Sequence, residues 1–128
     1  MERLILAGGQ SVAMRASALT PRLYRYKTGR DLLADMNKLK NAKKQRDELP
    51  KTATPEEIDE ADGKLLAVLD IFLDVAYVMA KQADSSLPDT ADEWLDTIDG
   101  VFSIHEVLPQ ILELWRINQQ TTSKPAKK

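Results

Sequence analysis

The sequence predicts one α+β domain, mostly α, in which an N-terminal β-hairpin packs on a bundle of about five helices. A length of 128 residues is that of a single domain. Only residues 3–17 alternate in the manner of strands, and the rest carries helical spacing with clear helix start signals. We expect the domain to span 1–118 and a flexible basic tail to occupy 119–128.

The N-terminal stretch "RLILAGGQSVAMRAS" predicts the hairpin. Leu4 and Leu6 alternate with their neighbours, the pair Gly8-Gly9 can adopt the positive φ of a tight turn, and the alternation resumes at Val12 and Met14. A lone hairpin is marginally stable in water, so this one must lie on helices or on a partner's sheet.

Helix start signals place the remaining elements. Thr20-Pro21 predicts an N-cap followed by proline at the first helical position, and "TPEE" (54–57), "TADE" (90–93) and "SIHE" (103–106) match the capping box. We therefore expect helices at 21–28, 31–44, 55–83, 91–99 and 104–119. Gly29 suits the C-terminal cap of the first, and Pro109 should kink or break the last.

The apolar run "LLAVLDIFLDVAYVMA" (65–80) predicts a central helix that its neighbours bury, with Asp70 and Asp74 sharing its one wet side. The run is shorter than a bilayer span, and the apolar stretch at the N-terminus is too short for a signal peptide. We expect a cytosolic protein that does not bind membranes.

Catalytic and metal-binding patterns are not found in the sequence. The chain has no cysteine and one histidine, His105, which excludes disulfides, thiolate sites, catalytic triads and multi-histidine metal sites. The acidic residues at 56–62 crowd the start of a helix, where the helix dipole favours them. The sequence thus predicts a protein that is not an enzyme and that uses no cofactor or metal.

Charge is strongly segregated along the chain. Residues 15–51 hold eleven Lys/Arg against four Asp/Glu, whereas residues 56–113 hold two against fifteen. Such asymmetry can mark a nucleic-acid surface, hold two parts of one domain together, or drive association of copies. The net charge of −2 and the absence of a helix-turn-helix or zinc pattern argue against nucleic acid. We expect Arg22, Arg25 and Arg30 to pair with the acidic block, within one copy or between copies.

The tyrosines near these arginines fit an amphipathic pattern. Tyr26 shares a predicted apolar stripe with Leu23, Leu32, Leu33 and Met36, which leaves Tyr24 half exposed.

The C-terminal region offers the strongest signal for protein contacts. It contains both tryptophans and several large apolar residues, of a kind that anchors interfaces. The interaction candidates are Trp94, Phe102, Ile111, Leu112 and Trp115. The alternative is that they fill the core of this domain.

Two stretches carry a family resemblance. "RASALTPRLYRYKTGRDLLADMNKL" (15–39) and "VAYVMAKQADSSLPDTADEWLDTIDGVFSIHEVLPQILELWRINQQTTSKPAKK" (75–128) resemble the tail assembly chaperones of long-tailed phages and prophages of Gram-positive bacteria, while 40–64 is neutral. The resemblance implies a protein that binds the helix-rich tape measure protein, keeps it soluble and helps recruit tail-tube protein. It also implies a host-cytoplasmic protein absent from the virion, and a possible longer form made by ribosomal slippage near "KPAKK".

Two other classes remain open at this point. A small tail structural or completion protein would have the same size and fold class, and a nucleic-acid-binding regulator would use residues 22–46. On the chaperone hypothesis, a folded Trp115→Ala variant should capture less tape measure protein. A homo-oligomer is possible in either phage role.

Overall fold

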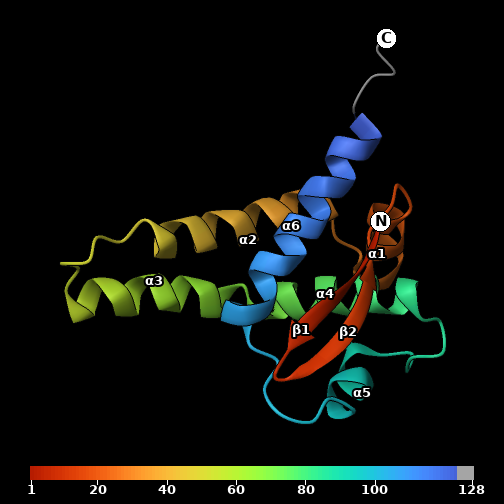
Figure 1. Cartoon of the computed structure of the whole chain (residues 1–128). Helices are drawn as coiled ribbons and strands as arrows, with labels where there is room; N and C mark the ends of the chain where they lie inside the picture. Colours follow the sequence, from red (N-terminus) through yellow and green to blue (C-terminus); the bar gives the residue numbers. More distant parts are fainter. Residues whose placement is uncertain (124–128) are drawn as a thin grey trace.

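The computed structural model describes residues 1–123, with side chains through residue 119. It contains an antiparallel hairpin followed by six helices, which confirms the predicted α+β, mostly α class (Figure 1). The elements in chain order are β1 (Glu2–Ala7), β2 (Gln10–Arg15), α1 (Thr20–Thr28), α2 (Leu32–Asp47), α3 (Pro55–Ala67), α4 (Leu69–Ala83), α5 (Ala91–Asp96) and α6 (Ile104–Ser123).

The hairpin forms where the sequence predicts it. Gly8 and Gly9 have φ of 60° and 85°, a conformation that costs glycine little and permits a two-residue turn. Its inner face carries Ile5, Ala7 and Met14, all buried, while Leu4 on the opposite face is 72% exposed. The inner face rests on α4, and α6 lies beside β1 (Figure 1).

Side chains of α6 close the outer edge of β1. The Gln110 amide accepts a hydrogen bond from the Leu6 N–H at 2.9 Å and donates one to the Leu6 carbonyl at 2.9 Å. The Glu106 carboxylate accepts from the Gly8 N–H at 2.8 Å. Side chains therefore satisfy the backbone groups of Leu6 and the Gly8 N–H that a third strand would pair, which blunts this part of the edge against pairing with other chains.

Helix α4 is the central helix of the core, as the sequence predicts. Seven of its residues are buried: Phe72, Val75, Ala76, Tyr77, Val78, Met79 and Ala80. It contacts β2, α1, α2, α3, α5 and α6, so most of its circumference is covered.

The predicted helix 55–83 is two helices, which is why the structure has six rather than five. The break falls at Val68, whose φ of −106° and ψ of 12° leave the helical region and whose N–H donates to Leu65 at 3.2 Å in a tighter turn. Gly63 stays inside α3, five residues before the break. Figure 1 shows α4 following α3 in the same general direction, so the break changes the local turn more than the path of the chain.

The oppositely charged blocks meet in the pair of helices α2 and α3, which extends away from the hairpin (Figure 1). The guanidinium Nε of Arg46 on α2 forms an ion pair with the Asp62 carboxylate on α3, at 2.8 Å. Thr54 and Glu57 form both hydrogen bonds of the predicted capping box at the start of α3.

Several helix ends differ from prediction. Thr20 does not cap α1; its hydroxyl instead accepts from the Ser17 N–H at 2.9 Å and donates to Gln82 on α4 at 2.7 Å. Helix α5 ends at Asp96 rather than at 99, and α2 runs on to Asp47.

Helix α6 runs through Pro109 without a break, and Pro109 is exposed at the surface. The capping box predicted at 103–106 does not form, because the Glu106 carboxylate accepts its hydrogen bond from the Gly8 N–H. Residues 119–123 of the predicted tail continue α6, and 124–128 lie outside the described residues.

Candidate functional site

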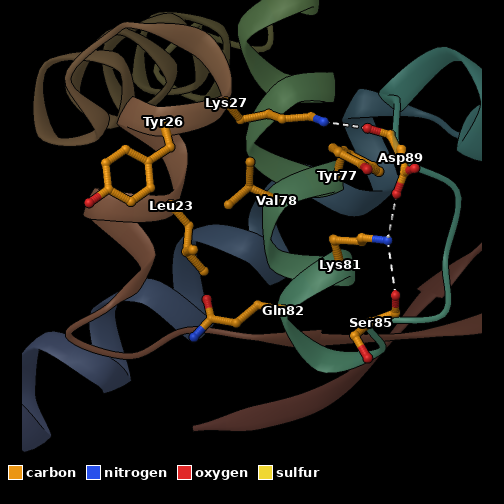
Figure 2. Close-up of a pocket in the computed structure, with 9 residues that line it drawn as sticks. All are labelled: Leu23, Tyr26, Lys27, Tyr77, Val78, Lys81, Gln82, Ser85 and Asp89. Carbon is orange, nitrogen blue, oxygen red and sulfur yellow. Dashed lines mark hydrogen bonds and ion pairs between the residues drawn. The ribbon is translucent and has the colours of Figure 1, made fainter.

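A groove of about 390 Å³ lies between α1 and α4 and is bordered on one side by the loop 84–90 (Figure 2). We call it the α1–α4 groove. Its lining residues are Leu23, Tyr26, Lys27, Tyr77, Val78, Lys81, Gln82, Ser85 and Asp89. The volume lies within the range of about 300–1,000 Å³ typical of binding pockets.

Two lysines hold the loop against the groove. Lys27 of α1 donates to the Asp89 carbonyl, and its ammonium lies 5.4 Å from the centre of the Tyr77 ring. Lys81 of α4 donates to the carbonyls of Ser85, at 2.9 Å, and Leu87. Lys81 also forms an ion pair with the Asp89 carboxylate, at 3.4 Å, whereas Lys27 has no carboxylate partner among the described residues (Figure 2).

Tyr77 forms part of the groove floor. Its hydroxyl donates to the Pro88 carbonyl at 2.5 Å. Burial raises the pKa of Tyr77, and the nearby carboxylates of Asp89 and Glu93 raise it further. Tyr77 therefore stays neutral and keeps its hydroxyl as a donor to the loop.

Tyr26 and Arg22 form the exposed rim on α1. Tyr26 is 69% exposed, and the Arg22 guanidinium lies 5.5 Å from the centre of its ring and donates to its hydroxyl at 2.5 Å. The prediction that Tyr26 lies in the apolar stripe and Tyr24 half outside is wrong. Tyr24 is fully buried, and Leu33 of the same predicted stripe is 48% exposed.

Beside the groove, a polar network joins α1, α2 and α4. The Tyr24 hydroxyl donates to the Asp35 carboxylate at 2.6 Å, and Arg30 donates to that carboxylate at 2.9 Å, to the Tyr24 hydroxyl at 3.0 Å and to Asp74 at 2.7 Å. A second hollow of about 310 Å³ lies between this network and the groove; it shares Arg30 and Asp74 with the network and Lys27 and Tyr77 with the groove.

The network fixes the charge state of its members. Burial and the hydrogen bond to Asp35 raise the pKa of Tyr24. Burial opposes ionisation of Asp35, but hydrogen bonds from Tyr24 and Arg30 outweigh it and hold the pKa of Asp35 below its ordinary value. The hydrogen bonds to Asp74 and then Asp35 raise the pKa of Arg30. The network thus consists of a neutral tyrosine, one cation and two carboxylates.

Of the three arginines expected to pair with the acidic block, Arg30 reaches Asp74 within the same chain. Arg22 and Arg25 form no ion pair with any residue in the described part of the chain. Arg22 stacks on Tyr26 instead, and Arg25 is exposed.

The aromatic candidates of the C-terminal region lie in or against the core. Trp94 is 2% exposed, with its ring centre 5.9 Å from that of Tyr77 and 5.4 Å from that of Phe102. Ile111 and Trp115 are 0% and 6% exposed. Phe102 and Leu112 are partly buried against them. The structure therefore places these residues in the domain's own core, and truncating Trp115 would test folding rather than a surface.

The described residues offer no metal-binding cluster, and each buried polar side-chain atom among them has a hydrogen-bond partner. His105 is exposed in the first turn of α6. Within residues 1–123, every helix falls short of the length and apolar character that a bilayer span requires. The groove is equipped to bind by shape and charge.

No protein-family model, curated protein or solved structure matches this chain. Functional inference therefore rests on the site and on the sequence resemblance.

The sequence does not mark Tyr77, Val78 or Lys81 as residues that line a groove, because they lie in or next to the apolar run 65–80. One signal was present. Lys81 follows Tyr77 by one helical turn, so a cation and an aromatic ring share a side of a helix that is otherwise apolar.

Proposed function

We propose that this protein is a tail assembly chaperone of a long-tailed phage or prophage of Gram-positive bacteria. It acts in the bacterial cytoplasm, where it binds the tape measure protein, keeps it from aggregating and helps recruit tail-tube protein. It uses no catalytic residue or cofactor.

One observation carries the proposal. The two stretches that resemble the chaperone family, 15–39 and 75–128, are separated in sequence by residues 40–74, of which 40–64 is neutral. All nine residues that line the α1–α4 groove belong to those two stretches. The neutral segment lies in the outer part of the α2–α3 pair and contributes none. The two stretches that carry the resemblance thus come together at this groove.

The groove has the properties that a chaperone of this kind needs. A protein that holds a client in solution must bind its exposed apolar segments, which takes an apolar surface with a charged rim. Leu23 and Tyr26 supply the apolar surface above Val78, which is 4% exposed, and Lys27 supplies a positive charge at its margin.

Co-expression tests the proposal. The cognate tape measure protein is produced in bacteria with and without this chain, and its soluble fraction and co-elution are measured. We expect the tape measure protein to be soluble and co-eluting only in the presence of the chain. A tape measure protein that stays insoluble beside abundant, folded chain would overturn the proposal.

Mass spectrometry of purified particles provides a second readout. A chaperone is absent from the finished particle. Stoichiometric presence of the chain there would instead identify a tail structural or completion subunit.

A further inference from the structure

We propose that the α1–α4 groove receives one turn of an amphipathic client helix, with a large apolar side chain between Tyr26 and Val78 and a carboxylate beside Arg22 and Lys27. The inference rests on the proposed function and names the kind of client segment that this site takes.

The dimensions of the groove set the size of what enters. On α1 the lining residues span 23–27, and on α4 they span 77–82. At 1.5 Å rise per residue each wall is about 6–8 Å long, or little more than one helical turn. Such a length accommodates one apolar side chain, or two at positions i and i+4 of a helix, and not an extended run.

The walls favour a helical occupant. An extended peptide needs backbone partners, but α1 and α4 use their backbone groups internally. The loop carbonyls at Ser85, Leu87 and Asp89 already accept hydrogen bonds from Lys81 or Lys27. A helix satisfies its own backbone and needs only side-chain contacts from the groove.

The charge on the α1 wall favours an acidic occupant. Helix α1 has no acidic residue, and Arg22 and Lys27 lie on either side of its groove-facing residues Leu23 and Tyr26. Asp89, on the loop, is the one carboxylate among the lining residues. A client carboxylate that faces α1 therefore meets two cations, whereas the one carboxylate available to a client cation, Asp89, is already paired with Lys81 at 3.4 Å.

Arg22 and Tyr26 are arranged in advance for such a contact. Their stacking and hydrogen bond hold two exposed, rotamer-rich side chains in one geometry before any client arrives. Pre-ordering lowers the entropy lost on binding, and arginine and tyrosine are among the residues that most often dominate interface energies.

A matched pair of charge reversals tests the inference. Arg22→Glu reverses charge at the groove, and Arg25→Glu makes the same change on the same helix. Arg25 is exposed and lies two positions from both Leu23 and Lys27, so it points away from these two lining residues. Tyr26→Ala removes the apolar wall. Circular dichroism confirms that each variant is folded.

The probes are two synthetic helical peptides with leucines at i and i+4, one flanked by glutamates and the other by lysines. Binding is measured by fluorescence anisotropy at low salt. We expect the acidic peptide to bind more tightly, and Arg22→Glu and Tyr26→Ala each to weaken it at least about tenfold. Arg25→Glu should change its affinity less than about threefold. Equal loss in both charge reversals, or equal binding of the two peptides, overturns the inference.

Co-expression with the tape measure protein separates this inference from the proposed function. If the wild-type chain solubilises its client and Arg22→Glu and Tyr26→Ala do so equally well, the groove inference fails and the chaperone role stands. If the wild-type chain does not solubilise the client, the proposed function itself fails.

Discussion

Replacing Tyr24 with phenylalanine tests whether the network of Tyr24, Arg30, Asp35 and Asp74 stabilises the junction of α1, α2 and α4. The substitution removes only the hydroxyl, which donates to Asp35 at 2.6 Å and accepts from Arg30 at 3.0 Å. Tyr24 is fully buried, so water cannot replace these bonds. A hydrogen bond to a charged group contributes about 1.5–3 kcal/mol, and we expect Tyr24→Phe to lower the free energy of unfolding by about 2–3 kcal/mol.

Urea unfolding monitored by circular dichroism measures this loss, and Tyr26→Phe provides the matched control. That variant removes a hydroxyl from the same helix, but at a side chain that is 69% exposed. We expect it to cost less than about 0.5 kcal/mol. Similar losses in the two variants would refute the assignment of stability to the buried network.

The same comparison has a defined pH dependence. The pKa of Asp35 is below its ordinary value of 3.8, so ionised Asp35 stabilises the fold above that pH and the contribution is lost as the pH falls through the lower native value. Tyr24→Phe removes one cause of the lowered pKa. The stability difference between wild type and Tyr24→Phe should therefore be largest near neutral pH and narrow below 3.8. A difference that stays constant across this range would show that the ionised carboxylate is not involved.

Three further substitutions test other parts of the fold. Gln110→Ala removes both hydrogen bonds to Leu6 and should cost about 1–3 kcal/mol, with faster amide hydrogen exchange at Leu6 as the specific readout. Thr54→Ala opens the capping box of α3 and should lower the free energy of unfolding by about 1 kcal/mol in urea titrations; no change would mean that the end of α3 frays freely in the native state. Gly8→Ala places a Cβ 2.7 Å from a backbone oxygen at a φ of 60° and should destabilise the fold by more than Gly9→Ala, where φ is 85° but no atom lies within 4 Å. Equal midpoints for the two glycine variants would show that the close contact relaxes without cost.

Local signals in the sequence were sufficient for the elements whose determinants are local. The turn at Gly8-Gly9 and the capping box at Thr54 depend on neighbouring residues, and both form as predicted. The capping box at 103–106 does not form, because Glu106 has a better placed partner in Gly8, almost a hundred residues earlier. A local sequence signal predicts a helix cap poorly wherever a distant group competes for the same side chain.

The orientation of α1 shows why the candidate site was only partly predictable. Its nine residues carry apolar groups on two sides, so spacing alone permits either Tyr24 or Tyr26 to point inward. The choice follows from partners far along the chain. Thr20, one turn before Tyr24, binds Gln82, and the Tyr24 hydroxyl binds Asp35. With that side turned inward, Tyr26 faces out and becomes the rim of the groove.

The aromatic residues of the C-terminal region were predicted at an interaction surface, but the structure places them in or against the core. Trp94 and Phe102 are of residue types that are common at interfaces. Their rings instead pack against those of Phe72 and Tyr77 on α4. A chain with 5% aromatic residues uses most of its large rings to fill its own interior.

The contact between Gln110 and Leu6 has a consequence for the order in which this protein can fold. The hairpin is translated well before α6, and the residues that close its edge, Glu106 and Gln110, lie 98 and 104 positions after their partners Gly8 and Leu6. Until α6 has been synthesised, β1 exposes unpaired backbone groups next to Leu4 and Leu6, which are among its most apolar residues. The nascent chain therefore exposes this edge until α6 has been translated, and docking of α6 is the step that closes it at Leu6 and Gly8.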